Sequence, residues 1–278
     1  AAAARAAAHA HAAAARAPVC LRLCVRVGGG GRGGGGRVLV RGAAAAANLG
    51  ALVGDDAREP EVADLEQVVL VVDDDVVDIT NLQRQIVHGT EDIDRPKVDS
   101  AEARLRSINP EVRIHKYPFR IVPDNAIELI SQYDLVLDGC DNFDTRYMIN
   151  DACYLAKTPL VSAALLRFEG QLTTIKAFEG GDAPCYRCIF PIPPAPGMVP
   201  RCEQAGIFGA VAGVLGTMQA TEALKELLGL GQSLSRRLVL YDSMNSDMRS
   251  LRVKRDSECA LCGDHPTIRS LQMAEAAE

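Results

Sequence analysis

The chain has 278 residues and 48% apolar residues, enough to bury a core in one large α/β domain or two small ones. Its formal net charge of −6 provides no basic footprint, so we expect no nucleic-acid partner. The longest apolar stretch, around 208–224, is interrupted by glycines, threonines and Glu222, so we expect no membrane span and no membrane partner.

The first 54 residues differ in composition from the rest of the chain. They contain seven arginines and no Asp or Glu, so their formal charge is +7; the remaining 224 residues then carry −13, because the whole chain carries −6. We expect three parts: a low-complexity, disordered or aberrant segment 1–54, one folded domain 55–271, and a tail 272–278. We expect a cytoplasmic protein. The alternative is organellar targeting, because transit peptides are also arginine-rich and free of acids, although they are usually rich in serine and this segment has none.

The folded part begins with strands and helices in alternation. Residues 68–72 are a continuous apolar run that ends in three aspartates, which is typical of a buried parallel strand. Next in chain order we expect helices 81–88 and 96–108, strand 112–117, helix 123–131 and strand 135–137. This order predicts a Rossmann-like, mostly parallel sheet, and open sheets of that kind bind ligands at the carboxyl ends of their strands.

The second half of the folded part predicts antiparallel strands in the sheet. A helix at 144–156 leads to strands 159–163 and 171–177, and the second strand alternates polar and apolar residues, as a half-exposed antiparallel strand does. The proline-rich stretch 191–200 predicts an ordered crossing or a mobile lid. A long helix 206–230 and a hairpin of 238–241 with 248–253 complete the domain. We therefore expect a sheet that continues from parallel into antiparallel strands.

Two CxxC pairs predict a metal site. Cys185 and Cys188 form one pair, Cys259 and Cys262 the other, and the spacing allows all four thiolates to reach one tetrahedral Zn²⁺. Four sulfur ligands leave no open coordination position, so the predicted zinc is structural. The alternative, two redox-active or accidental pairs, fits less well with a chain that carries no secretory signal.

Charged residues near the predicted strand ends suggest a nucleotide site. Asp73 follows the first predicted strand, where an acid accepts hydrogen bonds from ribose hydroxyls. Arg84 and Lys97 offer positive charge for phosphates, and Asp141 offers a carboxylate for Mg²⁺. Each residue alone could be a solvated helix charge or a turn former. The combination predicts nucleotide binding.

Seven stretches together resemble the MoeB/ThiF/HesA family, whose members are related to ubiquitin-activating enzymes. They are 73–78, 81–85 (Asn-Leu-Gln-Arg-Gln), 95–97 (Arg-Pro-Lys), 138–142, 167–171 (Arg-Phe-Glu-Gly-Gln), 184–190 and the final CxxC. The resemblance runs from about residue 68 to 271. It implies an adenylyltransferase that uses Mg²⁺ and ATP to activate the C-terminal carboxylate of a ubiquitin-like sulfur carrier ending in Gly-Gly, in a molybdenum cofactor, thiamine or tRNA thiolation pathway.

The resemblance also implies roles for individual residues. Asp73 would contact the ribose and Asp141 the metal, and the phosphates would lie against Asn81, Arg84 and Lys97. Thr80 and Asn142 belong to the same implied cofactor site. Cys202 aligns with a cysteine that some relatives use covalently; the alternative is an unreactive loop thiol. We also expect a homodimer, and a separate protein as sulfur donor, because the printed chain ends 16 residues after Cys262.

The glycine-rich phosphate loop of the family has no clear counterpart. One candidate is a strand at 37–40 followed by 42–50, where alanines 43–47 replace glycines. The other is the run with Gly28, Gly30 and Gly33, in which many spacings can be matched. This leaves a second interpretation, a non-catalytic, zinc-stapled scaffold that binds a ubiquitin-like partner. A third, an NAD-dependent oxidoreductase, would share the ribose-binding acid but would not account for Arg84, Lys97, Asp141 and the zinc site.

Overall fold

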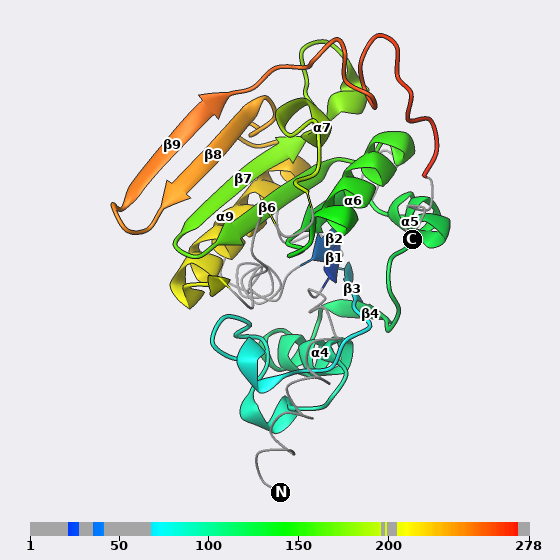
Figure 1. Cartoon of the computed structure of the whole chain (residues 1–278). Helices are drawn as coiled ribbons and strands as arrows, with labels where there is room; N and C mark the ends of the chain where they lie inside the picture. Colours follow the sequence, from blue (N-terminus) through cyan, green and yellow to red (C-terminus); the bar gives the residue numbers. More distant parts are fainter. Residues whose placement is uncertain (1–21, 28–35, 42–67, 196–197, 199–204, 272–278) are drawn as a thin grey trace, which may run out of the picture.

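The computed structural model describes residues 22–27, 36–41, 68–195, 198 and 205–271 (Figure 1). Its strands are β1 (Arg22–Val27), β2 (Gly36–Arg41), β3 (Val68–Val72), β4 (Arg113–Tyr117), β5 (Leu135–Asp138), β6 (Leu160–Leu166), β7 (Glu169–Ile175), β8 (Arg237–Asp242) and β9 (Asp247–Arg252). Its α-helices are α4 (Lys97–Ile108), α5 (Pro123–Ile130), α6 (Phe143–Ala156), α7 (Tyr186–Ile189) and α9 (Gly209–Leu228), with short 3-10 helices η1 (Ile79–Asn81), η2 (Thr90–Asp92) and η3 (Ala177–Glu179).

All the described strands form one sheet in the order β4-β3-β1-β2-β5-β6-β7-β8-β9. β3 and β4 are parallel, as are β2, β5 and β6. From β6 to β9, each strand is antiparallel to the next one in the sheet. The expected Rossmann-like α/β fold, with a parallel sheet that continues into antiparallel strands, is therefore confirmed.

Two strands lie within the compositionally distinct segment 1–54. β2 was expected at 37–40, and it pairs in parallel with β5 from Val38 opposite Leu135 to Val40 opposite Leu137. β1 was not expected; it is antiparallel to both β2 and β3. The two candidate phosphate loops, 28–33 and 42–50, lie outside the described residues.

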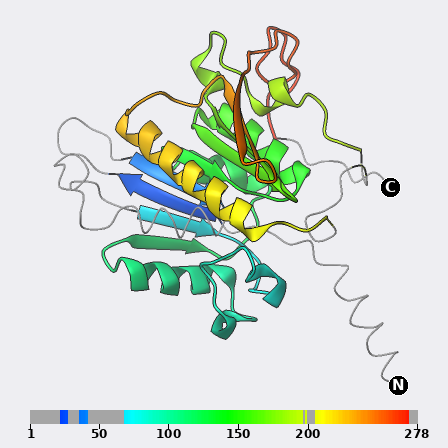
Figure 2. The same ribbon diagram turned by 90° about the vertical axis from the view of Figure 1, so that its left-hand side faces the viewer.

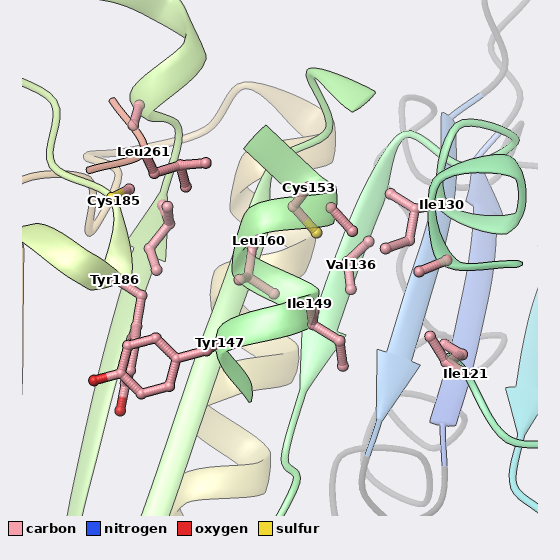
Figure 3. Close-up of a cluster of buried hydrophobic side chains, with 14 of the residues drawn as sticks. Ile121, Ile130, Val136, Tyr147, Ile149, Cys153, Leu160, Cys185, Tyr186 and Leu261 are labelled. Carbon is pink, nitrogen blue, oxygen red and sulfur yellow. The ribbon is translucent and has the colours of Figure 1, made fainter. Parts of the chain in front are cut away.

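Helices cover both faces of the central strands (Figures 1 and 2). On one face, residues of α4 and α9 pack with Val71, Leu135 and Leu137. On the other face, residues of α5 and α6 pack with Val72 and Val136. Figure 3 shows this second core, with side chains of α6 beside those of the sheet. Because successive strand residues enter opposite cores, both faces must be apolar, and this produces the continuous apolar runs in the sequence.

The expected helix at 81–88 is wrong. The chain forms the 3-10 helix η1 at 79–81 and then a series of turns. The Asp78 side chain accepts a hydrogen bond from the Thr80 N–H, and the Asn81 side chain accepts one from the Asp78 N–H. These bonds cap the first turn, and the chain then continues with hydrogen bonds three residues apart, from the Arg84 N–H to the Asn81 carbonyl and from the His88 N–H to the Gln85 carbonyl, so it forms turns in place of a regular α-helix.

Candidate active site and zinc site

Asp73 lies at the carboxyl end of β3, as the sequence predicted. Its side chain is buried, and Oδ1 accepts a hydrogen bond of 2.9 Å from the Asp75 N–H. Its own N–H donates to the Tyr117 carbonyl at the end of the neighbouring β4, at 3.2 Å. These backbone contacts hold the carboxylate at the edge of the sheet where Rossmann-like folds bind nucleotides.

Lys97 is fixed beside the same strand end by Asp75. Its N–H donates to the Asp75 carbonyl, and its Nζ lies 2.9 Å from Asp75 Oδ2. The lysine side chain is only 1% exposed. A buried ammonium group needs a charged or hydrogen-bonding partner, so Asp75 stabilises a positive charge close to Asp73.

The turn that follows β3 brings Arg84 into this region. Arg84 is half-buried, and its Nη1 donates to the Thr80 carbonyl at 3.0 Å. Hydrogen bonds from Thr80 lower the pKa of Asp78, and the positive charges of Lys97 and Arg84 lower it further. Both cations therefore lie near Asp78. The structure brings together five of the predicted nucleotide-site residues, namely Asp73, Thr80, Asn81, Arg84 and Lys97.

The predicted metal-binding carboxylate lies farther along the same edge. Asp141 is half-buried in the loop between β5 and α6. Asn142 is the N-cap of α6, and its Oδ1 accepts a hydrogen bond from the Thr145 N–H at 2.9 Å. Two strands separate β3 from β5, so at roughly 4.8 Å per strand spacing the two groups are about 14 Å apart along the edge.

The four predicted cysteine ligands form one cluster. Their Sγ atoms all lie within 4.8 Å of one another. The separations are 3.8 Å for Cys185 and Cys188, 3.5 Å for Cys185 and Cys259, and 3.3 Å for Cys188 and Cys262. A tetrahedral zinc with Zn–S bonds of about 2.3 Å requires sulfur separations of about 3.8 Å. The cluster therefore fits the predicted structural zinc.

Side chains of α6 hold the first cysteine pair in place. The Asn150 side chain accepts a hydrogen bond from the Tyr186 N–H at 2.8 Å. The Arg187 guanidinium donates to both carboxylate oxygens of Asp151 and lies over the Tyr147 ring. From the segment just before the second cysteine pair, the Asp256 N–H donates to Cys188 Sγ at 3.3 Å. Contacts of this kind orient metal ligands.

Comparison with known proteins identifies the family. Residues 61–261 match the ThiF family, which is most of the chain. The chain belongs to the ThiF family. The expected family and the expected enzyme class, an adenylyltransferase, are thereby confirmed.

Curated relatives are almost half identical to this ThiF-family chain over the regions that match. The sulfur carrier protein adenylyltransferase of Thermus thermophilus is 47% identical over 74% of this chain and 77% of its own length. The adenylyltransferase and sulfurtransferase MOCS3 of Bos taurus is also 47% identical, over 74% of this chain but only 45% of its own length. The chain thus spans less than half of the length of this second relative.

A solved structure supports the fold assignment. A crystal structure of E. coli MccB has a TM-score of 0.66 to the ThiF-family chain, with 17% identity, and the match covers 80% of this chain and 65% of MccB. At this identity the likeness shows a shared fold. No helix in the described part of the chain is long and apolar enough to cross a membrane.

Some site residues of this ThiF-family chain were not predicted. Arg146 lies 3.6 Å from Asp138 and donates to the Cys140 carbonyl. Burial alone would lower its pKa, but the charges of Cys140 and Asp138 raise it overall. Gln219 of α9 donates to the carbonyls of Asp138 and Val161, which joins the ends of β5 and β6. Only their positions in the fold reveal these roles, since no motif includes them. The predicted Cys202 lies outside the described residues.

Proposed function

We propose that this chain adenylylates the C-terminal glycine carboxylate of a ubiquitin-like sulfur carrier and thereby prepares it for thiocarboxylate formation. The observation that carries the proposal is the arrangement of acids and cations along one sheet edge, with Asp73 and the buried Lys97 at β3 and Asp141 at β5. The names of relatives, sulfur carrier protein adenylyltransferase and SAMP-activating enzyme E1, support this substrate class.

The proposed roles follow the chemistry of each side chain. Asp73 accepts hydrogen bonds from the ribose hydroxyls of ATP. Arg84 and Lys97 bind the phosphates, together with the buried Asn81, and neutralise the charge that develops as pyrophosphate leaves. The phosphate chain then extends along the edge toward Asp141. Thr80 and Asn142 shape the turn and the helix N-terminus on either side.

Asp141 would hold Mg²⁺ at the β5 end. Its carboxylate supplies the oxygen donor that magnesium prefers, beside a loop that Arg146 and Asp138 keep in place. The ion would supply positive charge to the phosphate oxygens. The zinc site has no part in this chemistry, because four cysteine sulfurs complete its coordination.

The reaction needs orientation more than proton transfer. The carrier carboxylate is already ionised at neutral pH, so it attacks the α-phosphate without a general base. A bond forms between the carboxylate oxygen and the α-phosphorus, and the bond to pyrophosphate breaks. The products are a carrier acyl adenylate and pyrophosphate. Catalysis is mainly positioning and charge neutralisation.

Later steps would involve partners. A separate protein would donate sulfur to the adenylate, and two copies of the chain would form a homodimer. Cys202 would act as the covalent or persulfide-carrying thiol. Replacing Cys202 with Ala should leave adenylate formation intact and abolish sulfur transfer to the carrier. Undiminished transfer would reject the covalent role.

Carrier-dependent exchange of radiolabelled pyrophosphate into ATP tests the proposed function directly. We expect exchange with a carrier that ends in Gly-Gly and none with a carrier truncated by those two residues. Mass spectrometry of the adenylates formed with different carriers would identify the pathway. Absence of exchange by folded, zinc-loaded protein would instead favour a non-catalytic scaffold, which the alanines at 43–47 would then explain.

A further inference from the structure

A buried histidine, His88, lies next to the proposed phosphate-binding lysine. Its side chain is only 7% exposed, and Nδ1 lies 2.8 Å from the Ser100 hydroxyl oxygen. The other ring nitrogen, Nε2, is also buried and has no hydrogen-bond partner among the described residues. Burial lowers the pKa of His88 to about 4, and the charge of Lys97 adds to this effect, so the ring is neutral near pH 7.

The hydrogen bonds of Ser100 determine which ring nitrogen carries the proton. The Ser100 hydroxyl also helps to lower the pKa of Asp92, as a hydrogen-bond donor facing that carboxylate does. An ionised carboxylate can only accept, so the single hydroxyl proton of Ser100 points to Asp92. Ser100 must then accept a hydrogen bond from His88, which places the ring proton on Nδ1. Nε2 is left as an acceptor with a free lone pair.

The His88 ring lies close enough to Lys97 for the charge of the lysine to lower its pKa. Lys97 and Ser100 both belong to α4 and are three residues apart, so their side chains are neighbours on one face of the helix, with Cβ atoms about 5–6 Å apart. His88 contacts Ser100 directly, and Lys97 reaches from the same face to Asp75. The lysine is 1% exposed, so its ammonium group is confined to this region.

We propose that His88 is a positioning residue for Lys97, with Nε2 accepting a hydrogen bond from the lysine ammonium group when that group turns toward the nucleotide phosphates. In the ligand-free chain, the Asp75 carboxylate pairs with the Lys97 ammonium group. Once ATP binds, the hydrogen bond to His88 orients the lysine side chain. A neutral acceptor suits this task, because a second carboxylate would repel the phosphates. The inference rests on the proposed ATP site.

Two substitutions of similar size separate this role from a structural one. His88→Asn places an amide nitrogen near Nδ1 and can keep the bond to Ser100, but it offers nothing at Nε2. His88→Gln places an amide oxygen near Nε2. The affinity of the full-length, zinc-loaded chain for Mg²⁺ and ATP is measured by calorimetry, without any carrier. We expect about tenfold weaker ATP binding for the Asn variant and less than threefold for the Gln variant, with similar Tm values.

A double substitution tests whether His88 acts through Lys97. In a Lys97→Ala background, His88→Asn should cause no further loss of ATP affinity, because no ammonium group remains to be oriented.

His115→Asn, at an exposed histidine of β4, is the matched control and should bind ATP like the unmodified chain. Unchanged ATP affinity of His88→Asn, an equal loss in His88→Asn and His88→Gln, or additive losses with Lys97→Ala would each overturn the inference. Failure of carrier-dependent exchange with intact ATP binding would count against the proposed function alone.

Discussion

The Arg187 guanidinium forms a two-point ion pair with Asp151, with Nε 2.8 Å from Oδ1 and Nη2 2.7 Å from Oδ2. Arg187 lies between Cys185 and Cys188, and Asp151 lies in α6. The two side chains are 18% and 7% exposed, so water screens the pair only partly. The pair therefore couples the four-cysteine cluster to the helix whose N-terminus adjoins Asp141.

Replacing Asp151 with Ala should destabilise the chain by roughly 3 kcal/mol, because it leaves a largely buried guanidinium without its carboxylate. Urea unfolding, followed by circular dichroism, measures the change in the free energy of unfolding. The matched control is Asp247→Ala, which removes the partner of the exposed Arg249 and should cause no measurable loss. Equal stability of the two variants would show that the Arg187 pair contributes nothing.

Removing the zinc should destabilise the whole domain. The two cysteine pairs are 70 residues apart, so by the cross-link entropy relation the metal constrains the unfolded chain by about 4 kcal/mol. We expect one zinc per chain by atomic emission, and a lower Tm after chelation or after Cys262→Ser. Cys153→Ser is a control for the metal content, because Cys153 is buried in α6 away from the cluster. A chain with four free thiols, no zinc and an unchanged Tm after chelation would contradict this prediction.

Two glycines should respond oppositely to alanine. A Cβ at Gly170 of β7 would lie 2.1 Å from Leu215 Cδ1 of α9, so Gly170→Ala should destabilise by roughly 1–3 kcal/mol through overpacking. A Cβ at Gly213, inside α9, would meet nothing within 4 Å, so Gly213→Ala should stabilise by roughly 0.5–1 kcal/mol. Thermal unfolding of both variants gives the sign of each effect. Destabilisation by both would mean that α9 does not tolerate an added methyl group at Gly213.

The strands were predictable where both faces are buried. β3 and β5 appear as continuous apolar runs because Val71 and Leu137 enter one core while Val72 and Val136 enter the other. β1 was not predicted, since its sequence, Arg-Leu-Cys-Val-Arg-Val, lies among glycine and alanine blocks and its pairing depends on β2 and β3. The helix predicted at 81–88 is instead a series of turns with hydrogen bonds three residues apart, which the spacing of apolar residues does not distinguish from an α-helix.

The site was predictable only for residues that a short motif contains. The cysteine spacing identified all four members of the cluster, and the strand-end acids were expected at a sheet edge. The supporting residues come from distant parts of the chain: Arg187 and Asp151 are 36 residues apart, and Gln219 reaches carbonyls 81 and 58 residues away. Tertiary packing alone brings these side chains together, so a local sequence pattern cannot predict their contacts.

Removing the Lys97 ammonium group should lower the rate of carrier-dependent pyrophosphate exchange by about 10²–10³-fold, as for other preorganised charges at developing negative charge. The variant is Lys97→Met, which keeps an apolar chain in the buried space and avoids a cavity. Lys116→Met, at the partly exposed ion pair with Asp99, is the control and should retain full exchange. Normal exchange by folded Lys97→Met would remove Lys97 from the proposed mechanism.

The stability of the chain should fall between pH 6.5 and pH 4 because of His88. Burial lowers the pKa of this histidine from its ordinary value of 6.5 to about 4, so the unfolded chain binds a proton over this range that the folded chain rejects. His88 imposes no penalty above about pH 6.5, and the penalty grows to about 3 kcal/mol near pH 4, at roughly 1.4 kcal/mol per pKa unit.

Urea unfolding at half-unit pH steps measures this dependence for the unmodified chain and for His88→Gln, which does not titrate. The difference between the two curves isolates the histidine from the carboxylates, among them Asp92, whose lowered pKa removes stability only at more acidic pH. His115→Gln is the control and should follow the unmodified chain, since that histidine is exposed. Parallel curves for His88→Gln and the unmodified chain would mean that the buried ring accepts its proton as readily as the unfolded chain does.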